Sequence, residues 1–115
     1  MIYLTDKKCV ACEGGMPPLT KAQIDELKPQ TPEWFVSDDL RFINREFTFK
    51  DFKQTLAFVN KVGELAESEG HHPDLFIHDY KKLAITLTTY AVKGLSENDF
   101  ILAAKIDLLA HTDET

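Results

Sequence analysis

The feature that most constrains the fold is a strict alternation of side chains between Lys82 and Tyr90. In the letters KLAITLTTY, Leu83, Ile85 and Leu87 alternate with small or polar residues. Successive side chains of a β-strand point to opposite faces of the sheet, so this strand has one apolar and one polar face. The apolar face needs a covering layer of helices. The polar face, which ends in Tyr90, suits solvent, a ligand or another subunit.

Helical periodicity before this strand predicts two helices. Thr20 and Gln23 have the spacing of a capping box, and Pro29 stops the short helix that they open. Thr48 and Asp51 are expected to open a second helix in the same way, with Asp in place of the usual Glu or Gln. Apolar residues recur at helical spacing from there to about residue 68, which predicts an amphipathic helix.

Gly70 and Ser96 mark the ends of two helices. Gly70 suits the C-terminal stop of the second helix, because glycine accepts the left-handed backbone found at such ends. Ser96 is the expected N-cap of a third helix, and Asp99 follows it at the third helical position. The apolar side of this helix is expected to comprise Phe100, Ile101, Ala104, Leu108 and Leu109.

Three further strands complete the predicted sheet. Residues 34–36 and 40–49 are predicted to form a hairpin around a turn at residues 37–39, and residues 75–77 a short strand. The resulting order is α-β-β-α-β-β-α. It predicts an α+β fold, a four-stranded antiparallel sheet with three helices packed on one face. Residues 1–18 are expected to form an N-terminal arm, and residues 19–115 the domain.

Composition and charge limit the classes of function. The 115 residues are 43% hydrophobic and 28% charged, which is typical of one soluble globular domain. The net charge of −6 gives no electrostatic attraction to nucleic acid or to an anionic membrane. No apolar run approaches the roughly eighteen residues that span a bilayer, and the first residues lack the order of a signal peptide. We therefore expect a cytoplasmic protein with no direct nucleic-acid or membrane partner.

Cys9 and Cys12 form one C-x-x-C motif within the arm. A zinc ribbon needs a second pair, and a thioredoxin site needs a strand-to-helix context that the arm lacks. A second pair could still come from another subunit. We expect no bound metal, and thiols that stay reduced in the cytosol.

His71 and His72 lie between the helix-ending Gly70 and a proline. One interpretation is structural, because a cationic imidazole interacts favourably with the C-terminal end of a helix. The other is functional, because adjacent side chains diverge and one histidine could bind a ligand while the other transfers protons near neutral pH. Spacing alone leaves both interpretations open. His78 and His111 have no partner visible in the sequence and are expected to be surface residues.

These histidines belong to a longer pattern. It consists of Glu67, three further residues, the letters HHP, the aromatic Tyr80 and the aspartate of GLSEND. Together these residues resemble the signature of the pterin-4a-carbinolamine dehydratase family, and the similarity extends from Leu19 to Asp107. The resemblance implies a four-stranded antiparallel sheet with helices on one side. It implies an enzyme that dehydrates 4a-hydroxytetrahydropterin to quinonoid dihydropterin in tetrahydrobiopterin recycling. It also implies a homodimer or homotetramer that needs no metal or organic cofactor.

The resemblance implies a role for each matching residue. His72 would be the main acid/base group, His71 would assist it and contact the substrate, and Asp99 would orient the site. The segments expected to contact the pterin contain Gly70, His71, His72, Pro73, Thr88, Thr89, Tyr90 and Ala91. Glu67 of the signature and Trp34, which matches an aromatic residue near the family's pocket, complete the expected substrate-binding set.

Tyr90 departs from the family pattern. Members commonly carry a third active-site histidine at this position, so Tyr90 is expected to act in the catalytic site in its place. A phenol has a reference pKa of about 10, so it can donate a hydrogen bond to the 4a-oxygen but is a poor base at neutral pH. Two alternatives to a dehydratase therefore stay open. One is a pterin-binding protein with weak or altered activity, for example in molybdenum-cofactor metabolism, and the other is an oligomeric interaction module without chemistry.

Overall fold

The helices and strands follow the predicted order. The computed structural model describes residues 3–11 and 14–113. The elements are the helices α1 (Lys21–Leu27), α2 (Phe52–Glu69) and α3 (Glu97–Asp113), the strands β1 (Phe35–Val36), β2 (Ile43–Thr48), β3 (Asp74–His78) and β4 (Lys82–Leu87), and the 3-10 helices η1 (Leu4–Asp6), η2 (Lys28–Gln30) and η3 (Tyr90–Val92). The α+β class and the order α-β-β-α-β-β-α are confirmed.

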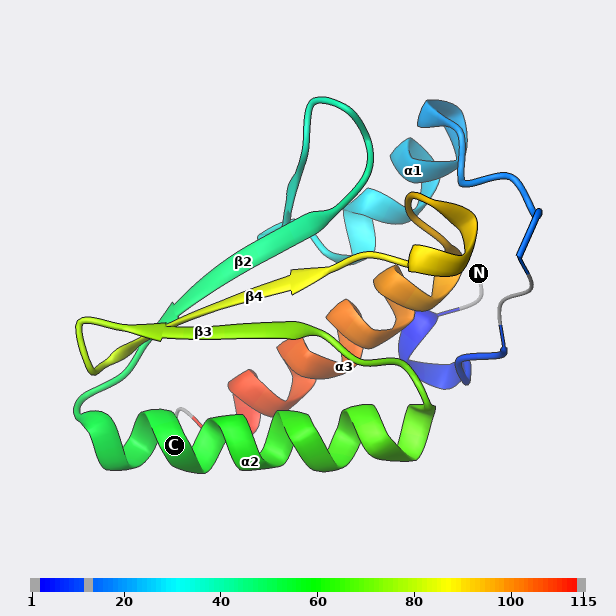
Figure 1. Ribbon diagram of the computed structural model, residues 1–115. Coiled ribbons are helices and arrows are strands. Elements are labelled where there is room, and N and C mark those ends of the chain that lie inside the picture. Colours follow the sequence, from blue (N-terminus) through cyan, green and yellow to red (C-terminus); the bar gives the residue numbers. More distant parts are fainter. Residues whose placement is uncertain (1–2, 12–13, 114–115) are drawn as a thin grey trace.

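The four strands form one antiparallel sheet in the order β1-β2-β4-β3. In Figure 1, α2 and α3 lie on the same side of this sheet. Leu83, Ile85 and Leu87 of β4 are fully buried in the core, as their alternation predicts. Thr86, between them, lies on the opposite face, where it is paired with Asn44 of β2.

Both ends of α2 are capped, although its start differs from the prediction. Asp51 is the N-cap, and its carboxylate accepts a hydrogen bond from the Gln54 amide at 2.8 Å. The prediction that Thr48 opens this helix is wrong, because Thr48 is the last residue of β2 and is paired with Lys82. Gly70 ends the helix with φ of 66°, the left-handed conformation that was predicted for it.

The last strand ends earlier than predicted, at Leu87. Beyond it, Thr89 pairs with Gly94 in an isolated bridge, and the Thr89 amide donates to the Gly94 carbonyl at 2.9 Å. The residues between them close a tight loop that contains η3, so Tyr90 lies in a turn and not on the strand. The prediction of a strand as far as Tyr90 is wrong. The pairing of Leu87 with Ile43 is the last between β2 and β4, and the chain then turns back at the bridge between Thr89 and Gly94.

Helix α3 is buried on more sides than an amphipathic helix requires. Leu102, Ala103 and Ile106 are fully buried, although their positions lie outside the predicted apolar side. The helix contacts α2, and η1 also packs on it and brings Leu4 into the same core. Leu108 was predicted on the apolar side but is 57% exposed. The N-terminal segment therefore contributes to the core of the domain.

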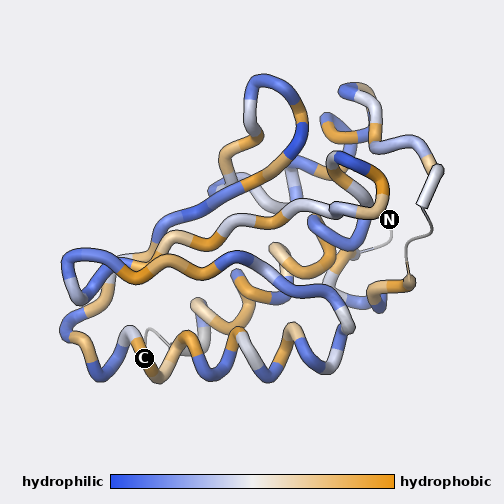
Figure 2. Tube along the Cα trace, in the orientation of Figure 1, coloured by the Kyte–Doolittle hydropathy of each residue, from blue (hydrophilic) through white to orange (hydrophobic). Residues whose placement is uncertain are grey.

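Hydropathy along the trace agrees with this arrangement. In Figure 2, hydrophobic and hydrophilic residues alternate along α2, and the buried ones include Phe58, Val62 and Ala66. One face of α2 thus covers the sheet while the other is exposed. Within residues 3–11 and 14–113, no helix is long and apolar enough to cross a bilayer.

Two glycines provide a matched test of the α2 backbone. Gly63 lies within α2 and Gly70 caps it, and an added Cβ would meet nothing within 4 Å at either position. Gly63→Ala should raise the free energy of unfolding by about 0.5–1 kcal/mol, because alanine favours the helix. Gly70→Ala should lower it by about 1 kcal/mol, because alanine disfavours the positive φ. Urea unfolding of both variants measures the two signs, and shifts of the same sign would contradict the assigned backbone.

Candidate active site

A pocket of about 290 Å³ lies where the C-terminal end of α2, the loop after β4 and the first turn of α3 meet. It is lined by Val10, Ala11, Gly70, His71, His72, Thr88, Thr89, Tyr90, Ala91 and Asn98. The lining includes most of the residues predicted to contact a substrate, but Glu67, Pro73 and Trp34 are not among them. Val10, Ala11 and Asn98 carry no sequence signal that identifies them as site residues.

Asp99 is the buried centre of this site. Its side chain is fully buried, and Oδ1 lies 2.6 Å from His71 Nε2. Its other oxygen, Oδ2, accepts from the Thr89 hydroxyl at 2.8 Å and from the Ser96 amide at 3.0 Å. Asp99 therefore both caps the first turn of α3 and holds the ring of His71, which is itself only 11% exposed.

The contacts of Asp99 also favour one tautomer of His71. Because the carboxylate of Asp99 accepts each of its hydrogen bonds, His71 Nε2 acts as the donor. In the neutral ring the other nitrogen, Nδ1, is then unprotonated and able to accept a proton. A carboxylate that fixes an imidazole in this way is a recurrent device for proton transfer.

His72 is held far more loosely than His71. Its Nε2 lies 2.9 Å from Glu67 Oε2, and the two side chains are 62% and 77% exposed. An exposed pair of this kind contributes little to stability, so it restricts the imidazole only weakly. His72 thus lines the pocket as an exposed imidazole, beside the fixed and largely buried ring of His71.

Tyr90 lies at the rim of the pocket. It is 75% exposed, and its hydroxyl donates to Asp74 Oδ2 at 3.4 Å, a long hydrogen bond. Thr88 lies in the same lining, and its hydroxyl donates to the Arg41 carbonyl at 2.5 Å. The phenol of Tyr90 therefore lies at the pocket rim and is not fixed by the core.

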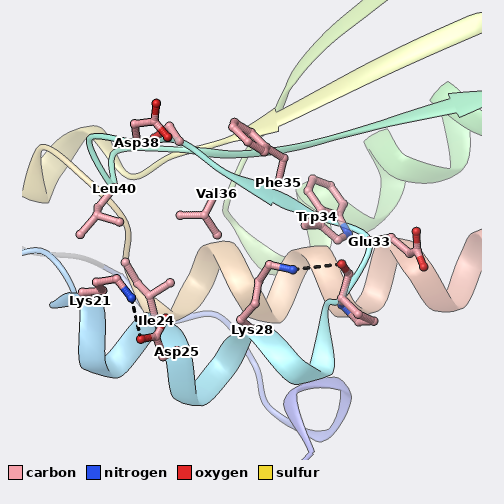
Figure 3. A pocket seen from close by; sticks show the side chains of 12 residues that line it. Lys21, Ile24, Asp25, Lys28, Glu33, Trp34, Phe35, Val36, Asp38 and Leu40 are labelled. Atoms are coloured by element: carbon pink, nitrogen blue, oxygen red, sulfur yellow. Dashed lines mark hydrogen bonds and ion pairs between the residues drawn. The ribbon is translucent and has the colours of Figure 1, made fainter.

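Trp34 lies away from this pocket. Its indole is buried and its Nε1 donates to Asp107 Oδ1 at 2.7 Å, as does Arg45. Burial raises the pKa of Asp107, although the hydrogen bond from Trp34 and the charge of Arg45 oppose that rise. Trp34 instead lines a separate hollow of about 600 Å³, together with Lys21 and Lys28. Figure 3 shows these side chains. The structure therefore does not bring Trp34 together with His71.

The other two histidines also lie outside the pocket. His78 has two acidic neighbours, with Nε2 3.3 Å from Glu46 Oε1 and Nδ1 3.1 Å from Asp79 Oδ2. Its ring stacks on Phe76 with the centroids 5.3 Å apart. His111 is exposed near the end of α3. His78 therefore serves as a control position for any role of the pocket histidines.

Glu69 fastens the N-terminal segment beside the pocket. Its Oε1 accepts from the Cys9 amide at 2.8 Å, and its Oε2 accepts from Lys105 Nζ at 2.7 Å. Burial alone would raise the pKa of Glu69, but the hydrogen bonds from Lys105 and Cys9 hold that pKa below its ordinary value. The ionised carboxylate thus connects the segment to α3 through Lys105.

Cys9 is buried against the same residues. Burial, together with the charge of Glu69, raises the pKa of the Cys9 thiol to about 12. The thiolate is the form that binds metals and exchanges with disulfides, so this thiol is inert while the segment is docked. Cys12 lies outside the described residues, and within the described ranges no three metal-binding side chains gather into a site.

A carboxylate-oriented histidine on a small pocket is an arrangement that can bind a small ligand and exchange protons with it. The family profile described as "Pterin 4 alpha carbinolamine dehydratase" matches residues 17–109, and the chain belongs to this family. A relative from Aromatoleum aromaticum is 50% identical over 109 residues, which cover 95% of this chain and 96% of the relative. A relative from Halorhodospira halophila is 47% identical over 106 residues, which cover 92% and 96%. Both are named "Putative pterin-4-alpha-carbinolamine dehydratase".

Two solved structures have similar folds. A crystal structure described as a transcriptional coactivator/pterin dehydratase from Brucella melitensis matches with a TM-score of 0.75 and 31% identity, over 81% of this chain and 98% of that chain. A pterin dehydratase-like protein described as a RuBisCO assembly factor in the alpha-carboxysome matches with a TM-score of 0.58 and 26% identity, over 68% and 89%. The fold thus occurs in proteins described by more than one function.

Glu69→Gln should change the pH dependence of stability. Because the folded-state pKa of Glu69 lies below its ordinary value of 4.5, its carboxylate stabilises the fold above that value. This contribution is lost as the pH falls through the folded-state pKa. Below about pH 4.5 the free energy of unfolding of the unmodified protein should therefore fall more steeply than that of Glu69→Gln.

Urea unfolding of both proteins at a series of pH values checks this expectation. Asp107 has a raised pKa and acts in the opposite sense, but it is present in both proteins, so the difference between the curves isolates Glu69. Parallel curves would show that the contacts of Glu69 with Cys9 and Lys105 do not stabilise the folded state.

Proposed function

We propose that the protein is a 4a-hydroxytetrahydropterin dehydratase, which converts its substrate to quinonoid dihydropterin and water. The observation that carries the proposal is the His71–Asp99 pair on a pocket that His72 also lines. Membership of the dehydratase family supports the choice of a pterin as substrate. The proposed setting is the recycling of a tetrahydropterin in the cytoplasm, by a homo-oligomer that needs no metal.

The reaction needs two proton transfers. The bond between C4a and its hydroxyl oxygen breaks, the oxygen gains a proton, and water leaves. N5 loses its proton, and its electron pair forms the new double bond to C4a. An acid therefore acts on the oxygen at C4a and a base acts at N5, the two ends of the C4a–N5 bond. Groups that titrate near neutral pH suit both tasks.

The contacts suit the two imidazoles to complementary parts of this reaction. His71 has a fixed orientation and an Nδ1 able to accept a proton, so it suits the base that removes the N5 proton. His72 is exposed at the pocket edge, so it suits the group that protonates the departing oxygen. This assignment keeps His72 as a principal acid/base group and gives His71 an equal part. Tyr90 can donate a hydrogen bond to the same oxygen.

Replacement of either pocket histidine should abolish most of the activity. His71→Ala and His72→Ala should each lower kcat/KM for carbinolamine dehydration by about 10²-fold or more, because general acid–base groups contribute about 10²–10⁴-fold. His78→Ala removes an imidazole outside the pocket and should stay within about twofold of the unmodified enzyme. The measurement is the decay of carbinolamine generated by a hydroxylase, followed with and without each protein. Equal activity of all three variants would refute the proposed roles.

Tyr90 favours a second candidate, a pterin-binding protein with little dehydratase activity. The pocket then binds a pterin, but a phenol stands where a base would complete the site. The likeness to a protein described as an assembly factor is in keeping with a member whose role is not catalysis. An interaction module without any pterin chemistry is the remaining alternative.

Tyr90→His should separate these candidates. Because Tyr90 is exposed and lies in a turn, histidine fits there without disturbing the core. We expect the substitution to raise kcat by about tenfold, within the range of a general acid–base group. The same carbinolamine assay and a pterin binding measurement give the result. Pterin binding with no turnover in either protein would favour the second candidate, and no binding in either would favour the interaction module.

A further inference from the structure

The N-terminal segment reaches the candidate active site from far away in the sequence. Val10 and Ala11 line the same pocket as His71 and His72, although they precede them by some sixty residues. Val10 is an apolar side chain, yet it is 71% exposed at this rim. A flat apolar surface, such as the ring of a heteroaromatic ligand, would remove this side chain from water and gain binding free energy by doing so.

Asn98 holds this segment through the backbone of Val10. The Val10 amide donates to Asn98 Oδ1 at 3.1 Å, and Asn98 Nδ2 donates to the Val10 carbonyl at 2.6 Å. Two opposed hydrogen bonds to one residue fix both the position and the direction of the chain there. Asn98 is buried, so its amide exchanges little with water and depends on these partners.

Further contacts place Cys9 between the same two helices. Its amide donates to Glu69 at the end of α2, and its thiol donates to the Asn98 carbonyl at 3.6 Å. Those helix ends also carry His71 and Asp99. The docked segment and the histidine–carboxylate pair are therefore built on one scaffold, the end of α2 against the start of α3.

We infer that Val10 and Ala11 form a wall of the ligand pocket, and that Asn98 is the positioning residue that holds this wall against a bound pterin. The inference rests on the proposed pterin ligand, and it concerns binding and not the chemical step. It follows that loss of the Asn98 side chain weakens pterin binding and raises KM while kcat changes little. By linkage, a bound pterin must also stabilise the docked segment.

Cys9 offers a direct measure of docking. The sequence contains two cysteines, so in a Cys12→Ser background Cys9 is the sole thiol. While the segment is docked, Cys9 is buried and its thiol is unreactive. The rate of Cys9 alkylation by iodoacetamide therefore reports the undocked fraction, without any need for enzymatic activity.

The experiment compares three variants in this background. Asn98→Ala removes the two hydrogen bonds to the Val10 backbone, and Val10→Gly removes the apolar side chain but keeps those bonds. Lys7→Ala removes a partly exposed ion pair between the same segment and Glu97 of α3. For each we measure Cys9 alkylation, the dissociation constant of 7,8-dihydrobiopterin by calorimetry, and KM and kcat where turnover occurs.

Asn98→Ala should raise both the alkylation rate and the pterin dissociation constant by about tenfold, as expected for the loss of two hydrogen bonds. Val10→Gly should raise the dissociation constant several-fold and leave Cys9 protected. Lys7→Ala should change each quantity less than about twofold, since exposed ion pairs contribute little. In the parent protein, saturating 7,8-dihydrobiopterin should slow alkylation.

Three outcomes would overturn the inference. One is faster alkylation in Asn98→Ala with an unchanged dissociation constant for the pterin. That result would mean that undocking the segment does not affect the pterin site, so the docked segment is not a wall of it. Another is continued protection of Cys9 in Asn98→Ala, and the third is no effect of the pterin on alkylation in the parent protein. A parent protein that binds the pterin and protects Cys9 but shows no turnover would refute the proposed dehydratase activity alone.

Discussion

The buried carboxylate of Asp99 is the contact on which the rest of the site depends. A carboxylate removed from water is strongly destabilising unless hydrogen bonds replace its hydration. The His71 ring, the Thr89 hydroxyl and the Ser96 amide supply those partners. They belong to the end of α2, the loop after β4 and the start of α3. One side chain thus joins the end of α2 to the loop after β4 and to the start of α3, and the pocket lies where these three segments meet.

Asn98, the residue before Asp99, holds the N-terminal segment that lines another side of the pocket. Asn98 precedes Asp99 in the first turn of α3, and it binds the Val10 backbone while Asp99 binds His71. The end of α2 has the same arrangement. Glu69 accepts a hydrogen bond from the Cys9 amide, and two residues later His71 contacts Asp99. The end of α2 and the start of α3 therefore hold both the pocket histidines and the N-terminal segment that lines the pocket.

Features that depend on nearby residues were predictable from the sequence. The capping box of Thr20 and Gln23 is present, and Gly70 ends α2 as predicted, because each signal and its partner lie within one helical turn. The pairing of Asn98 with Val10 was not predictable, because 88 residues separate them and neither has a distinctive neighbourhood. Position in the tertiary structure, and not local pattern, brings these two residues together.

The structure gives the two adjacent histidines different surroundings. After the left-handed residue at the end of α2, His71 turns to the buried Asp99 and His72 to the exposed Glu67. A largely buried, fixed imidazole and an exposed one on the same pocket suit a reaction that takes a proton from one atom and gives one to another. Tyr90, which lines the same pocket, carries a phenol and is a poorer base at neutral pH than the two imidazoles. The activity of such a site therefore depends on how much of the proton transfer the two imidazoles carry without a third.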